Sequence, residues 1–289
     1  MNRYFAITLK VLIVLFALIG VTFTAVFIAM QFGLLNVRGS ILERNAFFTG
    51  SGTNSASVEM AQDTSTSCPG NASTCTWQET REWAVVSGGL EKDVAVINDV
   101  SSKTGVPSRL IASVVVPEQM RFFTSEREVF KRYFEPLKIL GSLSQFSLGV
   151  SGIKQETANK IEQYASDPSS PFYPGDGYAT LLAYQPGTDH DAELYKRLTD
   201  PKNHYYSYLY TALFIKEIEA QWERAGYPIA NKSDIVATLF NIGFENSVPK
   251  TNPQVAGAVI SVGGTDYPFG ALASTFYLST ELTTQFPAR

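Results

Sequence analysis

An uncharged apolar run near the N-terminus constrains this chain more than any other feature. Residues 11–30, VLIVLFALIGVTFTAVFIAM, contain no charged side chain, and about 20 such residues are enough for a helix to cross the hydrocarbon core of a bilayer. Arg3 and Lys10 precede the run, and no acidic residue does. Because positive charge favours the cytoplasmic side, we expect residues 1–10 in the cytoplasm and a transmembrane anchor over residues 11–34.

A cleaved signal peptide is the alternative interpretation of this run, since such peptides also place positive charge before an apolar segment. The run is long for a signal peptide, however, and no small-x-small cleavage site follows it. We therefore expect an uncleaved anchor that crosses the cell membrane once and leaves the rest of the chain outside the cytoplasm.

The segment over residues 35–76 has the composition of a flexible tether. Its second part is dominated by Ser, Thr, Gly, Asn and Ala, which bury too little apolar surface to offset the entropy lost on ordering. Cys68 and Cys75, the two cysteines of the chain, lie within it. In an oxidising compartment they would close a small disulfide loop. A metal site is the competing interpretation, but it lacks nearby ligands because both histidines come far later in the sequence.

Residues 77–289 have the pattern of a single, mainly α-helical domain. Hydrophobic residues make up 45% of the chain, which is enough for a packed core. The formal charge of −4 and the lack of Lys/Arg runs interleaved with aromatic residues indicate no nucleic-acid partner. A stretch rich in Pro, Gly and Tyr over residues 167–191 predicts a long loop. The helices predicted from apolar spacing span residues 90–105, 106–116, 124–134, 152–165, 205–226 and 232–243.

A carboxylic acid interrupts the most apolar of these helices. Glu118 follows Ile111 and Val115 at helical spacing, so it projects from the apolar face of the helix. Pro117 precedes it and cannot donate a backbone hydrogen bond to the carbonyl of Ser113. The sequence therefore predicts that the helix bends or stops where Glu118 leaves the core.

Two roles are open for Glu118. A carboxyl group among apolar neighbours holds its proton more readily than one in water, and it can then serve as a general acid near neutral pH. Alternatively, Glu118 forms an ordinary ion pair with Arg109 or Arg121 at the edge of a packed helix. These residues alone favour the ion pair. Three further stretches bear on the choice: SLGVSGIKQETA at 147–158, DPKNHYYSYLYTALFI at 200–215 and FNIG at 240–243.

Together with the helix of Glu118, these stretches resemble the lysozyme-like domain of lytic transglycosylases, the murein-cleaving family related to goose-type lysozyme. In that family a G-V-x-P turn leads into a helix that carries the catalytic glutamate. TGVPSRLIASVVVPEQ resembles this approach and supplies Glu118, with Gln119 in place of the family's serine. The resemblance covers residues 90–245 in the family's order and implies a lysozyme-like fold.

SLGVSGIKQETA resembles the family's cleft-lining S-x-G-x-x-Q-I segment and the start of the helix after it. Gly152 stands where the family has glutamine. The resemblance implies that Ser147, Gly149 and Ser151 contribute to substrate binding. The positions that match the family are Ser147, Gly149, Ile153, Thr157 and Ala158.

The last two stretches resemble an aspartate-proline step before a long helix and the Y-N-A-G corner that ends a short helix in the family. FNIG keeps Asn241 and Gly243, and Phe240 replaces the tyrosine. The resemblance implies that Phe240 and Asn241 lie at the substrate, together with Gln119. Tyr178 is a further candidate, because it lies in the long loop and loops often carry binding surfaces.

The family's reaction uses one carboxyl group, so the resemblance implies Glu118 as the only catalytic residue, with no metal and no cofactor. The substrate it implies is the glycan strand of peptidoglycan, cleaved between MurNAc and GlcNAc to leave a 1,6-anhydromuramyl end. A hydrolytic muramidase would instead need a second acid facing Glu118. Glu126, Glu128 and Glu156 are the nearest candidates in sequence.

A third possibility belongs to another class of protein. Gln119, Gly152 and Phe240 depart from the family's pattern, and these departures favour a lysozyme-like module that has lost catalysis. Such a module would bind glycan or act as a scaffold in an assembly of the cell envelope. It would retain peptidoglycan as a partner without releasing soluble fragments from it.

Overall fold

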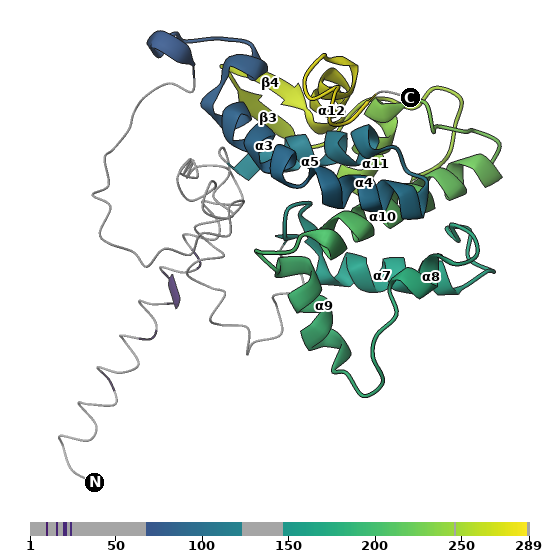
Figure 1. Cartoon of the computed structure of the whole chain (residues 1–289). Helices are drawn as coiled ribbons and strands as arrows, with labels where there is room; N and C mark the ends of the chain where they lie inside the picture. Colours follow the sequence, from purple (N-terminus) through teal and green to yellow (C-terminus); the bar gives the residue numbers. More distant parts are fainter. Residues whose placement is uncertain are drawn as a thin grey trace.

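The computed structural model of the chain is mainly helical, which confirms the predicted fold class at that level (Figure 1). Apart from isolated positions, the expected anchor over residues 11–34 and most of the expected tether lie outside the described residues. No helix in the described part of the chain combines the length and the apolar character that a membrane crossing requires. The structure describes residues 68–122, 147–245 and 247–287, together with Lys10, Phe16, Gly20, Val21 and Thr24.

Where the sequence predicts one helix over residues 90–105, the structure has two. α3 (Arg81–Lys92) and α4 (Val94–Thr104) separate at Asp93, where the backbone leaves the helical conformation with φ −93° and ψ 5°. α4 ends at Gly105, as predicted, and the φ of Gly105 is 74°. This left-handed conformation costs glycine less than any other residue, so it is a common end to a helix.

α5 (Ser108–Phe122) carries Glu118, and it does not stop at Pro117. Of the two predicted outcomes, a bend or a stop, the stop is wrong. A proline inside a helix costs about 3 kcal/mol, whereas each fully buried aliphatic side chain contributes about 1.5–3 kcal/mol. Every apolar side chain between Leu110 and Met120 is buried. This burial outweighs the one missing hydrogen bond, and the helix continues to Phe122.

A small antiparallel hairpin follows in the described chain. β1 (Ser147–Leu148) pairs with β2 (Ile153–Lys154), with Ser147 opposite Lys154. Gly149 and Gly152 in the turn have φ of 64° and 65°, a region that other residues rarely adopt. α7 (Gln155–Ser166) begins later than the helical pattern predicts, because the two residues before it pair in β2.

α10 (Tyr205–Arg224) lies at the centre of the fold, as Figure 1 shows. It packs against α4 on one side and against α7 and α9 (His190–Thr199) on another. The stretch over residues 167–191, predicted as loop, contains the short helix α8 (Tyr178–Leu181) and the first residues of α9. The fold therefore has one long helix between two groups of shorter ones.

The C-terminal part adds a hairpin that the sequence pattern did not predict. α11 (Ser233–Ile242) is followed by β3 (Val259–Val262), which pairs antiparallel with β4 (Thr265–Pro268) around a Gly-Gly turn. α12 (Phe269–Leu278) then packs against α11 and α5. The strands are short. β3 alternates between exposed and buried residues, but its exposed Val259 is apolar, and β4 is largely exposed, so the sequence of neither strand shows a clear alternation of apolar and polar residues.

The guanidinium of Arg109 joins α5 to the end of α12. It is fully buried and donates hydrogen bonds of 2.6–3.1 Å to five backbone carbonyls. A helix C-terminus has carbonyls without helical partners and favours a positive charge. These contacts commit Arg109 to α12 and leave Arg121 as the partner of Glu118. The acceptors are the carbonyls of Phe276, Tyr277, Ser279, Glu281 and Phe286.

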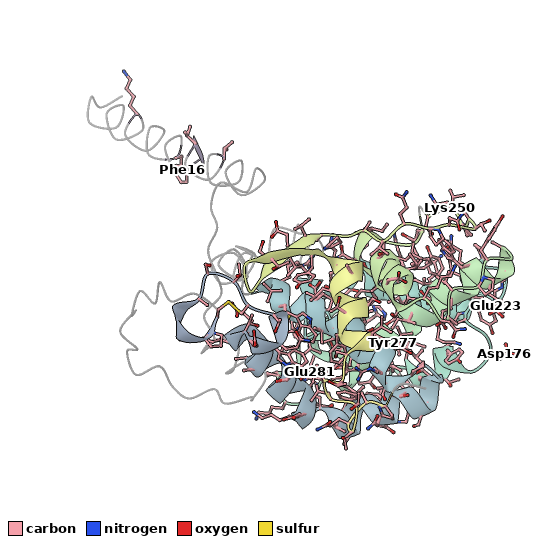
Figure 2. All side chains as sticks on the ribbon, turned by 90° about the horizontal axis from the view of Figure 1, so that it is seen from above. Phe16, Asp176, Glu223, Lys250, Tyr277 and Glu281 are labelled. Carbon is pink, nitrogen blue, oxygen red and sulfur yellow. A yellow bond between two sulfur atoms is a disulfide. The ribbon has the colours of Figure 1, made fainter. Side chains whose placement is uncertain are left out.

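The predicted disulfide between Cys68 and Cys75 is confirmed, with the two Cα atoms 5.7 Å apart. Figure 2 shows it in yellow at the edge of the domain. The loop that it closes lies against the turn between β3 and β4: the amide of Cys75 donates to the carbonyl of Gly263 at 2.9 Å. A Cβ added at Gly264 would come within 2.6 Å of the carbonyl oxygen of Ser73. The disulfide loop therefore packs on the domain.

Candidate active site

Glu118 lies near the C-terminal end of α5 and is 4% exposed. Its Oε1 is 2.5 Å from Nη2 of Arg121, one turn further along the same helix. Arg121 keeps 16% of its side-chain area exposed, against 5% for Glu118. The ion pair that the sequence left open for Glu118 is thus present. The guanidinium supplies the opposite charge that a buried carboxylate requires.

Gly152, in the turn between β1 and β2, lies directly against the carboxyl group of Glu118. A Cβ added at Gly152 would overlap Glu118 Oε1 and would come within 2.5 Å of Cδ and 2.7 Å of Cγ. The φ of Gly152 is also positive, at 65°. Both the lack of space for a Cβ and the left-handed backbone therefore require glycine at this position. By its resemblance to the family, the sequence suggests that a glutamine has been lost at position 152. In the structure, the absence of a side chain at Gly152 leaves room for the carboxyl group of Glu118.

Gln119 ties α5 to the same turn. It is fully buried, and its Nε2 donates a hydrogen bond to the carbonyl of Val150. Its Oε1 is buried and has no hydrogen-bond partner within the described part of the chain. Gln119 and Glu118 are consecutive on α5. Gln119 holds the turn of the hairpin through its hydrogen bond to Val150, and Glu118 contacts the same turn at Gly152.

Gly149 and Ser151 fix the other side of this turn. A Cβ added at Gly149 would overlap the carbonyl oxygen of Leu198 in α9 and would come within 2.8 Å of Oγ of Ser207 in α10. Ser151 is 1% exposed, and its Oγ lies 3.0 Å from the carbonyl oxygen and 2.9 Å from Oγ of Ser207. Both residues hold the turn against α9 and α10. The backbone of Ser147 pairs with Lys154 in the same hairpin.

Asn241 and Phe240 lie at the end of α11. The Oδ1 of Asn241 accepts a hydrogen bond from the amide of Ala258 at 2.8 Å, next to β3, and β3 packs against α5. Phe240 is 8% exposed, and its ring centroid is 5.1 Å from that of Phe214 in α10. Asn241 therefore braces a strand beside the helix of Glu118, and Phe240 belongs to the aromatic core.

Tyr178 lies in a different part of the domain. Its hydroxyl donates a hydrogen bond to the carbonyl of Thr104 at 3.0 Å, at the end of α4. This contact fastens α8 to α4. The structure thus brings Glu118, Gln119 and the turn of the first hairpin together, whereas Tyr178 is placed by contacts with α4.

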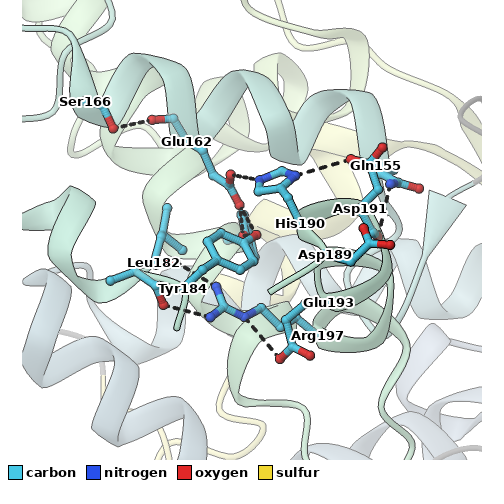
Figure 3. Close-up of polar contacts among 12 residues, drawn as sticks. Gln155, Glu162, Ser166, Leu182, Tyr184, Asp189, His190, Asp191, Glu193 and Arg197 are labelled. Carbon is cyan, nitrogen blue, oxygen red and sulfur yellow. Dashed lines mark hydrogen bonds and ion pairs between the residues drawn. The ribbon is translucent and has the colours of Figure 1, made fainter. Parts of the chain in front are cut away.

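A cluster of polar side chains around Glu162 in α7 was not predicted (Figure 3). Its Oε1 accepts hydrogen bonds from the hydroxyls of Tyr184, at 2.5 Å, and Tyr210. Its Oε2 lies 2.7 Å from Nε2 of His190. Burial and the bond to Glu162 raise the pKa of Tyr184 to about 12, and the hydrogen bond to Glu162 raises the pKa of His190. The guanidinium of Arg197 lies 3.9 Å from the centre of the Tyr184 ring.

Glu217 in α10 is a second buried acid that the sequence did not single out. It is fully buried, and neither carboxyl oxygen has a hydrogen-bond partner within the part of the chain that the structure describes. Burial, and to a lesser extent the charge of Glu245, raise the pKa of Glu217 well above its ordinary value. Glu245 itself is held by Lys160 at 2.7 Å and by the hydroxyl of Tyr164. No local sequence pattern could have revealed these contacts between distant residues.

Among the described residues, no three His, Cys, Asp or Glu side chains gather closely enough to hold a metal ion. Comparison of the chain with protein-family models, with curated proteins and with solved structures found no match. The chemistry that the site can perform therefore follows from its own groups. They are a buried carboxyl group, a guanidinium within 2.5 Å of it and a rigid turn that fixes the position of the carboxyl group.

Proposed function

We propose that this chain is a membrane-anchored peptidoglycan lytic transglycosylase whose described domain has a lysozyme-like fold. The observation that supports it most directly is the contact between Glu118 and the turn at Gly152. The sequence resemblance assigns Glu118 the role of the catalytic glutamate, and it assigns the turn at Gly152 to the segment that lines the cleft. Two segments that the resemblance relates to one site are therefore in contact, and the contact requires glycine.

In the proposed reaction, protonated Glu118 donates its proton to the oxygen that bridges C1 of MurNAc and C4 of GlcNAc, and the bond from C1 to this oxygen breaks. The carbonyl oxygen of the acetamido group on MurNAc stabilises the electron-poor C1. The C6 hydroxyl of the same sugar then bonds to C1 and returns a proton to the carboxylate of Glu118. No water is consumed, so one carboxyl group suffices where most glycosidases use two.

The expected location agrees with this function. An anchor over residues 11–34 would hold the domain on the outer side of the cell membrane, where peptidoglycan lies. The disulfide between Cys68 and Cys75 is the kind of bond that forms and persists outside the reducing cytoplasm. Neither feature specifies the reaction, but both are compatible with a substrate in the cell wall.

The ion pair of Glu118 with Arg121 at 2.5 Å favours a second candidate. A carboxylate that is paired in this way cannot donate a proton until the pair opens, and a catalytically lapsed glycan-binding or scaffold module would keep it closed. A hydrolytic muramidase has less support. Glu156 in α7 is half-exposed, with a lysine nitrogen 3.7 Å from it, and Glu126 and Glu128 lie outside the described residues.

The test is the chemistry of the products. The purified full-length chain, kept in detergent, is incubated with purified peptidoglycan in water enriched in heavy oxygen, and the soluble fragments are analysed by mass spectrometry. The proposal predicts 1,6-anhydromuramyl ends without heavy oxygen. Reducing ends that carry heavy oxygen would indicate a muramidase. Glycan binding without soluble fragments, from a chain shown to be folded, would indicate the binding module.

A further inference from the structure

We propose that Arg121 selects glycan strands that carry a free carboxylate, by exchanging the carboxylate of Glu118 for that of the substrate. The carboxylate in question is the lactyl group on C3 of muramic acid residues that have lost their stem peptide. This inference rests on the proposed function and names its preferred substrate class. It assigns to Arg121 a role in specificity as well as in release of the catalytic acid.

The ion pair creates the need for such an exchange. Glu118 is 4% exposed and its Oε1 is 2.5 Å from Nη2 of Arg121, so Arg121 must leave the carboxyl group before that group can act on the substrate. Separating a buried pair is costly when nothing replaces the lost partner. An anionic group on the substrate can take the place of Glu118 beside Arg121. The guanidinium then keeps a negatively charged partner throughout.

Arg121 has the position and the chemistry for this role. Its side chain is more exposed than that of Glu118, 16% against 5%, so Arg121 is the member of the pair that is more accessible to an incoming anion. The planar guanidinium binds a carboxylate through two parallel hydrogen bonds. Arg109, the other arginine of α5, is committed to five carbonyls in the last turn of α12 and in the segment that follows it.

The chemistry of the substrate fits the spacing of the two side chains. In muramic acid the lactyl ether is on C3, two ring bonds from C1, where the glycosidic bond breaks. On a peptide-bearing strand the lactyl group ends in an uncharged amide, whereas on a peptide-free strand it ends in a carboxylate. Glu118 and Arg121 are neighbours one turn apart on a helix, so one can act at C1 while the other binds the substituent on C3.

The exchange also balances charge and protons. Before binding, Arg121 pairs with Glu118; after binding, it pairs with the lactyl carboxylate. Glu118, now buried without a cation beside it, takes a proton from solvent, since an unpaired buried charge is costly. That proton is the one donated to the bridging oxygen, and the C6 hydroxyl returns one at the end of the reaction.

The test compares two strands that differ only in this group: peptide-free glycan with free lactyl carboxylates, and the same glycan with those carboxylates converted to methylamides. We expect the full-length wild-type chain to cleave the carboxylate form about tenfold faster, as for one charged hydrogen-bonded contact. In Arg121→Gln the ratio of the two rates should fall to about one, and Arg121→Lys should give an intermediate ratio.

Lys216→Gln is the matched control, because it opens another ion pair at the same helical spacing, to Glu219 at 3.8 Å in α10. It should leave the ratio unchanged. A wild-type ratio near one, or an unchanged ratio in Arg121→Gln, overturns the proposal. Binding of both strands is measured by sedimentation on the same preparations. If neither strand is cleaved, the proposed function fails. In that case, equal binding of the two strands would separately overturn the proposed selection of free carboxylates by Arg121.

Discussion

The carboxyl group of Glu118 lies against the backbone of Gly152, so closely that a Cβ added at position 152 would come within 2.5 Å of Glu118 Cδ. Arg121 contacts the same carboxyl group at 2.5 Å. The acid is thus held between a rigid turn and a cation, at the end of a buried helix. In the proposed reaction Glu118 is the general acid, and such a group depends on its position, because a displacement of about 1 Å can cost a hundredfold in rate.

Gly152→Ala should therefore reduce release of anhydromuramyl products by about a hundredfold, because the new methyl group displaces the carboxyl group of Glu118. It should also destabilise the chain, since a left-handed backbone costs a residue with a Cβ about 1–2 kcal/mol. Gly226→Ala is the control: Gly226 also has positive φ, 84°, but nothing lies within 4 Å of an added Cβ. Equal loss of activity in both variants would contradict the account.

Arg109→Gln should lower the free energy of unfolding by about 3 kcal/mol or more, because five buried or partly buried carbonyls lose the charged donor of a fully buried side chain. Urea denaturation measures the change. Arg224→Gln provides the comparison, since exposed Arg224 also donates to backbone carbonyls, those of Pro171 and Tyr173, and should cost no more than about 1 kcal/mol. Similar costs for the two variants would show that burial of Arg109 contributes little.

Glu217 should make stability fall as pH rises. Burial, followed by the charge of Glu245, raises the pKa of Glu217 well above its ordinary value, so the folded chain holds a proton that the unfolded chain releases from about pH 4.3 upward. Stability from this group is complete below that pH and is lost as pH approaches the folded pKa. Glu217→Gln should therefore gain stability over wild type as pH rises, measured by urea denaturation at several pH values.

The control for this prediction is Glu223→Gln, on the same helix at an exposed position. This variant removes a carboxyl group from α10 at a solvent-exposed position, so it serves as the reference for loss of a negative charge without loss of a buried group. A difference between Glu217→Gln and wild type that stays constant across the pH series would contradict the prediction, because it would mean that Glu217 titrates alike in the folded and unfolded chains.

His190 should also make the stability of the chain fall as pH rises, in the range near neutral pH. The hydrogen bond to Glu162 raises its pKa, so its contribution is complete below about pH 6.5, the ordinary value, and is lost as pH rises through the raised one. Because His190 is 44% exposed, we expect His190→Gln to cost less than about 1 kcal/mol at low pH, and less still at high pH. A double-mutant cycle with Glu162→Gln measures the coupling; zero coupling at low pH would be the contrary result.

The sequence was sufficient where structure depends on neighbours along the chain. α10 and α11 follow from apolar spacing, and the end of α4 follows from Gly105, whose φ is 74°. The disulfide follows from two cysteines in an expected export context. In each case the deciding interaction lies within a few residues, so a local pattern contains it.

The sequence was insufficient where the deciding contact is distant. α5 continues through Pro117 because the surrounding core buries it, although a proline favours the end of a helix by local rules. Gly152 appears in the sequence only as a missing glutamine, since its role depends on Glu118, which lies on another element. The cluster around Glu162 likewise joins α7, α9 and α10. Such roles become visible only when the elements are placed in space.

The most direct test of the central claim is the rate at which anhydromuramyl ends are released from purified peptidoglycan by the full-length chain, compared between wild type, Glu118→Gln and Glu156→Gln. The account predicts product from wild type and from Glu156→Gln, and none from a folded Glu118→Gln. Release of anhydromuramyl ends by Glu118→Gln at the wild-type rate would contradict it, because the reaction would then use another acid.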